Sequence, residues 1–345
     1  MAEKKNIASA ALFLIFIITF TNAPQTLVAQ GDNKCGTESQ NPCTNKSKAL
    51  GLKIIALLCI LFASVIGVFL PLVTSSFPAL HPAGVVFTVV KSLASGIILA
   101  TGFMHVLPDS FDMLRSSCLN DNPWHRFPFS SFVAMLSAVV TMAIDSLATS
   151  MYRKKNAAES PRDAASQNVE MGFTPADKGV EEDTQISRSR VIAMVLEIGI
   201  IVHSVVIGLS LGASSNTCSI RGLIAALCFH QMFEGMGLGG CILQAQYGLL
   251  KKASMAFFFS VTTPLGIAVG IGLSNTYKEN SPRALITEGL LNGSSAGLLI
   301  YMALVDLLAA DFMGQKLQGS IKLQMYCFLA VLLGCGGMSI LAMWA

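Results

Sequence analysis

The stretch CFHQMFEGMGLGG, residues 228–240, decides the fold and the chemistry of this chain. It lies in a long apolar segment, 219–247, that we expect to form a helix. In a helix, His230 and Glu234 are spaced i, i+4, so their side chains project from one face about 6 Å apart along the axis. An imidazole and a carboxylate placed in this way can bind one divalent ion, and inside a bilayer each would otherwise be a costly unpaired polar group.

The glycines that follow Glu234 indicate close helix packing. Residues 235, 237, 239 and 240 are all glycine. Without side chains at these positions, a neighbouring helix can approach the ligand face closely. We therefore expect a second helix to lie against this one.

The composition is that of an integral membrane protein. Of the 345 residues, 53% are hydrophobic and only 12% are charged, whereas about 25% of the residues in a soluble domain are charged. The net charge of +3 is small and spread over the loops. This composition therefore predicts that the chain is embedded in the lipid bilayer and does not bind nucleic acid.

Residues 1–29 have the features of a secretory signal peptide. Lys4 and Lys5 precede an apolar run, 7–20, that is shorter than the roughly 20 residues a membrane span needs. The alternative is an uncleaved extra membrane helix. Cleavage near Ala29 would place the next segment, 30–49, outside the cytosol.

Hydropathy predicts eight transmembrane helices, three within 50–152 and five within 190–345. No segment shows the two-residue alternation of a barrel strand, so we expect an all-α membrane protein. Between the two groups, 153–189 is polar and low in aromatic residues, and we expect a disordered cytosolic loop. The eight helices are expected near 50–72, 84–107, 129–152, 190–213, 219–247, 252–274, 284–309 and 321–344.

With the N-terminus outside, eight spans return the C-terminus to the outside. Lysines and arginines near the helix ends are more numerous in the loops that this orientation assigns to the cytosol, as the positive-inside rule requires. The same orientation places four cysteines on the oxidising side, where three disulfide connectivities are open. These cysteines are Cys35, Cys43, Cys118 and Cys218.

A second His and carboxylate pair occurs in the predicted span 84–107. His105 and Asp109 are again spaced i, i+4, and Asp112 follows. Because Pro108 weakens the helix at this point, we expect both aspartates at the exoplasmic mouth of a metal pathway. Met104, one residue before His105, could face the same pathway.

The predicted span 190–213 carries a third histidine. His203 is followed by Gly208 and Gly212, and this four-residue spacing of small residues suits close packing against the glycine-rich segment 219–247. Such packing would bring His203 to His230 and Glu234, a nitrogen-rich set that suits Zn²⁺ or Fe²⁺ better than Mg²⁺ or Ca²⁺. The weaker oxygen donors beside it would be Ser204 and Gln231.

Four stretches resemble a known family. HSVVIGLSLGAS (203–214) and CFHQMFEGMGLGGCI (228–242) resemble the signature of the ZIP, or zinc- and iron-regulated, transporters. SGIILATGFMHVLPDSF (95–111) and GLLIYMALVDLLAADF (297–312) are similar to the plant iron-regulated branch of that family. The likeness covers essentially the whole mature chain.

The resemblance implies a carrier that imports divalent transition metals into the cytosol. It implies a 3+2+3 arrangement of eight helices, in which the outer sets of three are inverted repeats and the fourth and fifth helices form the metal centre. On the family motif, His203, His230 and Glu234 match the central ligands. His105 and Asp109 match positions near the entrance.

Two departures from the family pattern carry further expectations. Relatives with a two-metal centre have a carboxylate where this chain has Ile207, and an aspartate where it has Gln231. We therefore expect one metal in the central site. In addition, 153–189 contains no histidine, although members of the branch commonly have a His-rich repeat there. We do not expect this loop to capture metal.

The predicted function is import of Zn²⁺, Fe²⁺ or both across the plasma membrane, with an internal membrane as the alternative location. The metal is then the substrate rather than a cofactor, and transport of Mn²⁺, Co²⁺ or Cd²⁺ stays open. The rival function is an intramembrane metal-dependent hydrolase, although the chain has no HExxH motif. A receptor that uses metal structurally lacks an output domain. The sequence leaves energy coupling and the oligomeric state, including a homodimer, undecided.

Overall fold

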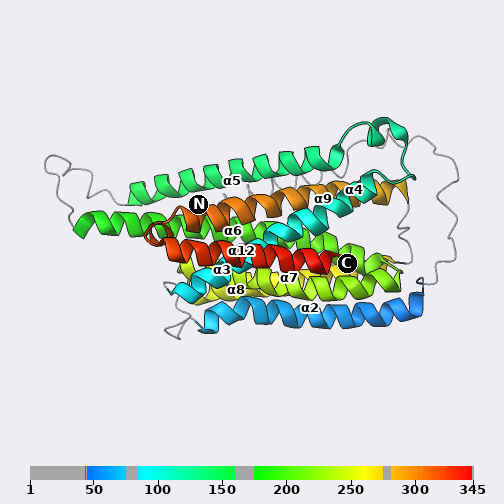
Figure 1. Ribbon diagram of the computed structural model, residues 1–345, viewed down its shortest axis with the longest axis horizontal. Helices are drawn as coiled ribbons and strands as arrows, with labels where there is room; N and C mark the ends of the chain where they lie inside the picture. The colour runs from blue at the N-terminus through cyan, green and yellow to red at the C-terminus, as the bar shows by residue number, and fades with distance from the viewer. Residues whose placement is uncertain (1–42, 44, 75–83, 160–174, 275–280, 344–345) are drawn as a thin grey trace.

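The computed structural model describes residues 43, 45–74, 84–159, 175–274 and 281–343, and in these ranges it consists of helices and their connections. Figure 1 shows the long helices running side by side, with α5 along one margin and α2 along the opposite margin. The predicted signal peptide, 1–29, lies outside the described residues. The predicted exoplasmic segment, 30–49, is described only at residue 43 and from 45 onward.

Eight long helical stretches follow one another along the described chain. Two of them are continuous across a π-helical turn, and these are α3–η4–α4 and α9–η6–α10. The elements are α2 (Lys46–Thr74), α3 (Val85–Thr101), η4 (Gly102–Val106), α4 (Leu107–Leu114), η5 (Asp121–His125), α5 (Phe129–Glu159), α6 (Pro175–Ala213), α7 (Thr217–Gln244), α8 (Leu249–Leu273), α9 (Pro282–Tyr301), η6 (Met302–Ala309), α10 (Ala310–Phe312), α11 (Gln315–Gln318) and α12 (Ile321–Ala342).

Seven of the described helices are long and apolar enough to cross a membrane. The eighth predicted span, 219–247, is the helix α7, which is 28 residues long but is not among those seven. Glycines and the polar residues His230, Gln231 and Glu234 take the place of apolar side chains along it. Among the long helices, α7, which carries two of the three predicted central ligands, therefore depends most on its neighbours for shielding from lipid.

The two helices beside the predicted cytosolic loop are longer than expected. α5 continues to Glu159 and α6 begins at Pro175, so the segment predicted as a disordered loop, 153–189, is helical at both ends within the described residues. The physical reason is helix propagation. Once a helix has formed, adding residues with good helix propensity, such as the Ala, Lys and Glu found here, is easy.

Glycines set the closest helix contacts in a first bundle, formed by α2, α6, α7 and α8. A Cβ atom added at Gly235 or Gly239 of α7 would overlap the backbone of α2 at Gly67 and Val68. On α6, Gly208 and Gly212 lie against α8, where Gly266 and Gly270 face them. Such glycine-mediated contacts let the helix backbones touch and make these pairs rigid.

The glycine contacts of α6 correct one expectation. The small residues of α6 were expected to pack against the glycines of α7, but they pack against α8. The glycines of α7 pack against α2 and α3. A pattern of small residues identifies a face that accepts a close neighbour without identifying the neighbour. α6 and α7 still contact each other, through the faces that carry the histidines.

A second bundle contains α3, α4, α5, α9 and α12. Gly96 of α3 and Gly334 of α12 each lie against the backbone of the other helix, and Gly297 of α9 lies against Ala134 of α5. α4 is held to α9 by a hydrogen bond of 2.6 Å that Ser110 Oγ donates to the carbonyl oxygen of Gly289. The two bundles meet mainly where α3, α5 and α9 contact α6 and α7.

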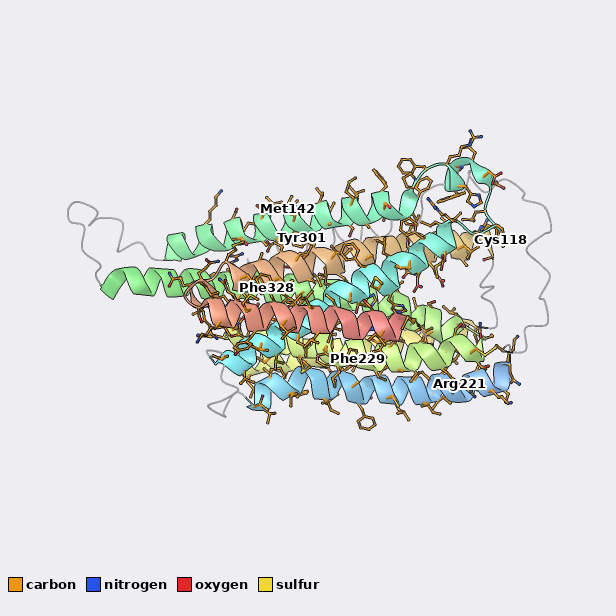
Figure 2. All side chains as sticks on the ribbon, viewed as in Figure 1. Cys118, Met142, Arg221, Phe229, Tyr301 and Phe328 are labelled. Atoms are coloured by element: carbon orange, nitrogen blue, oxygen red, sulfur yellow. A yellow bond between two sulfur atoms is a disulfide. The ribbon has the colours of Figure 1, made fainter. Side chains whose placement is uncertain are left out.

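Disulfides mark one end of the molecule. Cys43, before α2, is bonded to Cys218, in the first turn of α7, and Cys118 is also disulfide-bonded. In Figure 2, Cys118 lies at the same end as Arg221 of α7. Because disulfides persist on the oxidising side of a membrane, this end is expected to be exoplasmic, in agreement with the orientation inferred from the charged loops. The opposite end, where α7 ends and α3 begins, is then cytosolic.

Candidate metal centre

Three predicted ligands meet in the interior, where α6 and α7 face each other. Ligand atoms of His203 on α6 and of His230 and Glu234 on α7 all lie within 4.8 Å of one another. All three side chains are at most 1% exposed. The i, i+4 spacing places His230 and Glu234 on the same face of α7, and α6 supplies the third ligand from the other side.

Most polar side-chain atoms of this cluster have no hydrogen-bond partner. Both carboxylate oxygens of Glu234, both ring nitrogens of His230 and the Nε2 atom of His203 are buried without a partner. Buried polar groups are nearly always hydrogen-bonded, and a buried, unpaired carboxylate is destabilising by several kcal/mol in real proteins. One ligand atom from each of the three residues, all within 4.8 Å of one another, is therefore expected to share a bound cation.

His203 is oriented by a residue that the sequence did not suggest. Its Nδ1 atom lies 3.0 Å from Ser295 Oγ on α9, and Ser295 is fully buried. A histidine that ligates metal through Nε2 commonly donates its Nδ1–H to an oxygen acceptor, which fixes the tautomer and the ring orientation. The spacing of Ser295 in the chain gives no signal of this role, because the contact joins residues 92 positions apart.

Further buried oxygen and nitrogen atoms lack partners on the helices around the cluster. Ser204 Oγ lies on α6, Gln231 Nε2 on α7, and Thr263 Oγ1 on α8. Ser204 and Gln231 were expected as weaker donors beside the centre, whereas Thr263 was not. A threonine before a proline in an apolar helix carries no pattern that could have drawn attention to it.

His105 and Asp109 lie on a line that leads outward from the cluster. The ring of His105, in η4, is 6.1 Å from the ring of His230, and the ring of His203 is 5.8 Å from the ring of His230. Asp109 Oδ2 lies 4.0 Å from His105 Nδ1. The side chain of Asp109 is 43% exposed, whereas that of His105 is buried, so the line runs from the surface to the three central ligands.

The remaining predicted pathway residues lie further out. Asp112 is exposed, one turn beyond Asp109 towards the disulfide-bearing end. Met104 is 49% exposed beside the exposed Phe103, whereas His105 is buried. Successive residues of a helix point about 100° apart, so Met104 and His105 do not share one face. A place for Met104 in the pathway stays a prediction.

The donor set determines the chemistry of the centre. Two imidazoles and one carboxylate are borderline ligands that suit Zn²⁺, Fe²⁺ and similar ions, whereas Mg²⁺ and Ca²⁺ prefer sites made only of oxygen. The described residues offer three strong ligands rather than a closed cage of four thiolates. Such a site can release its ion, as a conduction pathway requires.

Comparison with known proteins agrees with this chemistry. A family model described as ZIP zinc transporter matches residues 50–342. Fe(2+) transport protein 1 of Arabidopsis thaliana is 61% identical over 353 residues, covering 100% of both chains. Probable zinc transporter 8 of the same plant is 58% identical over 349 residues, again covering 100% of both. Fe(2+) transport protein 1 of Oryza sativa subsp. japonica is 53% identical over 348 residues, covering 93% of each.

Proposed function

We propose that this chain, which belongs to the ZIP zinc transporter family, imports Zn²⁺, Fe²⁺ or both into the cytosol through the centre formed by His203, His230 and Glu234. The observation that carries the proposal is the cluster of three buried ligands within 4.8 Å of one another. Relatives named as Fe(2+) and zinc transporters support the choice of metals. Transport, and not hydrolysis, is the function these relatives share by name.

The ion enters at the exoplasmic mouth and passes inward along the line of side chains described above. Asp112 and Asp109 attract the cation at the surface. The cation then binds His105 and moves from there to His230. The two ring centroids are 6.1 Å apart, so neighbouring imidazoles can exchange an ion over a short step. Neutral imidazole binds metal and imidazolium does not, so acidification of the site reduces metal affinity.

The packing of the helices suggests how the ion is released to the cytosol. All three central ligands belong to the bundle of α2, α6, α7 and α8, whereas His105 and Ser295 belong to the other bundle. Because glycine contacts make each bundle rigid, the ligands move together when one bundle rocks or slides against the other. Such a movement turns the loaded centre from the exoplasmic mouth towards the cytosolic end.

Two departures from the pattern of the two-metal relatives lead us to propose a single metal in the centre. Ile207 and Gln231 occupy the positions where a second set of carboxylates would be needed. Purified protein should therefore bind one equivalent of Zn²⁺ per centre by elemental analysis. Two equivalents, both removed by Glu234→Ala, would rule out the single-metal centre.

The protein is proposed to act at the plasma membrane, and cellular metal content tests the function. Cells deficient in metal uptake should accumulate zinc, iron or both when they express the wild-type chain. The variant His230→Ala should not, although it reaches the surface. His125→Ala is the matched control, because His125 lies in the exoplasmic turn η5, bonded to Asp121. Accumulation by His230→Ala at the wild-type level would disprove import through this centre.

A further inference from the structure

A buried lysine ties the two bundles together at the cytosolic end. Lys91 Nζ on α3 donates hydrogen bonds to Asp311 Oδ1 on α10, at 2.9 Å, and to Gln244 Oε1 at the end of α7, at 3.1 Å. The Lys91 side chain is 5% exposed and that of Asp311 is 19% exposed. Neither the ligand set nor the entrance line uses these residues.

The two bonds of Lys91 differ in kind. Lys91 and Asp311 both belong to the second bundle, and their bond joins two charges. Gln244 belongs to the first bundle, and its bond to the ammonium has a neutral acceptor. Charge pairs are the stronger bonds, so the Lys91–Gln244 bond is the one that breaks first. When it breaks, Asp311 still neutralises the buried ammonium, which avoids the penalty of an unpaired buried charge.

The position of these residues places them between the centre and the cytosol. Gln244 follows Glu234 by 10 residues on α7, about 15 Å along the helix axis. Lys91 precedes His105 by 14 residues on the helix α3–η4, about 21 Å away on the side opposite the disulfide-bearing end.

We propose that Lys91, Asp311 and Gln244 form a latch that closes the cytosolic exit. Asp311 anchors the lysine in one bundle, and the lysine holds the end of α7 in the other. Breaking the Lys91–Gln244 bond frees the end of α7 and opens the exit. This inference rests on the proposed transport function, because the latch has a purpose only if an ion leaves at this end.

Cys241 reports the state of the latch. It lies one turn before Gln244 on α7, is 2% exposed, and interacts electrostatically with Lys91. The test replaces the other free cysteines (Cys59, Cys228, Cys327 and Cys335) with serine. Inside-out membrane vesicles are then exposed, without any metal, to a membrane-impermeant maleimide on the cytosolic side. Because no transport is measured, failure of the latch and failure of metal import give separate results.

Three variants decide the outcome. Gln244→Leu removes only the acceptor in the first bundle and should speed labelling of Cys241 about tenfold or more, the effect expected from losing one hydrogen bond to a charged group. Gln244→Glu gives the ammonium a charged acceptor and should slow labelling below the wild-type rate. Lys316→Gln is the matched control. Lys316 donates to Gly84 O and to Thr88 Oγ1, at the start of α3. These hydrogen bonds stay within the second bundle, so this variant should label as wild type does.

The two Gln244 variants distinguish a latch from a purely structural role of Gln244. A loss of packing would make both of them label faster. The latch is overturned if Gln244→Leu labels at the wild-type rate, if Gln244→Glu labels faster than wild type, or if Lys316→Gln labels as fast as Gln244→Leu.

Discussion

At the scale of single residues, the proposed metal binding should depend on how His203 is held as well as on the ligands themselves. Its Nδ1 atom is fixed by Ser295 Oγ at 3.0 Å, which leaves Nε2 facing His230 and Glu234. Ser295 comes from the other bundle. The bond therefore orients a ligand only while the two bundles are in the arrangement seen here.

We predict that Ser295→Ala weakens zinc uptake without removing it. Loss of a group that orients a metal ligand typically lowers metal affinity 10- to 100-fold, so the KM for zinc should rise by about tenfold or more. Ser294→Ala is the matched control, since Ser294 Oγ donates to Ser137 Oγ and not to a ligand. Equal KM values for the two variants would show that Ser295 does not orient the site.

The sequence singled out the three residues that the structure brings together, but not the residue that orients one of them. His230 and Glu234 stood out because the i, i+4 spacing is a local property of a helix. His203 stood out because a histidine in an apolar span is costly. Ser295 carries no such signal, because serine is common in membrane helices and its partner His203 is 92 positions away in the sequence. Only the packing of α9 against α6 reveals it.

At the scale of helices, the fold depends on glycine contacts that leave no room for a methyl group. Gly212 of α6 lies against the backbone of α8 at Ile267 and Gly270. Backbone atoms cannot move aside as flexible side chains do, so a larger residue has to push the two helices apart. That displacement would also shift His203, which lies on the same helix.

We predict that Gly212→Ala destabilises the protein by roughly 1–3 kcal/mol, the usual result of overpacking a close contact. Gly272→Ala on α8 is the matched control, because a Cβ atom there meets nothing within 4 Å. Thermal unfolding of both variants in detergent measures the difference. The account of the α6–α8 contact fails if the two melting temperatures are equal.

The helices were largely predictable from hydropathy, but their neighbours were not. Seven predicted spans correspond to helices that are apolar enough to cross a membrane, and α7 differs because it carries the site. The small residues of α6 predicted a close neighbour, but the choice of α8 over α7 depends on the shape of whole faces. The lengths of α5 and α6 were underestimated because polar residues can continue a helix beyond the membrane.

At the scale of the whole molecule, the two ends differ in how they are joined. The exoplasmic end carries the covalent bond between Cys43 and Cys218, which ties the chain before α2 to α7 within one bundle. The opposite end, which we expect to be cytosolic, is joined across the bundles by the hydrogen bond from Lys91 to Gln244. This difference suits a carrier whose ligand-bearing bundle stays intact while its contacts with the other bundle change.

We predict that Cys218→Ser lowers the free energy of unfolding by about 2–4 kcal/mol, as loss of a disulfide typically does. Cys59→Ser is the control, because Cys59 is a free and exposed cysteine on α2. Thermal unfolding in detergent without reductant compares the two variants. Identical stability would mean that the disulfide does not hold α2 and α7 together.

His203, His230 and Glu234 are proposed to carry the metal across the membrane. The most direct measurement is zinc influx into liposomes that contain only the purified protein, as wild type or as Glu234→Ala. Wild type should fill the liposomes with zinc well above the leak of empty liposomes, and Glu234→Ala should lose about tenfold or more of that influx. Influx that is the same in both proteins, or no higher for wild type than for empty liposomes, would contradict the account.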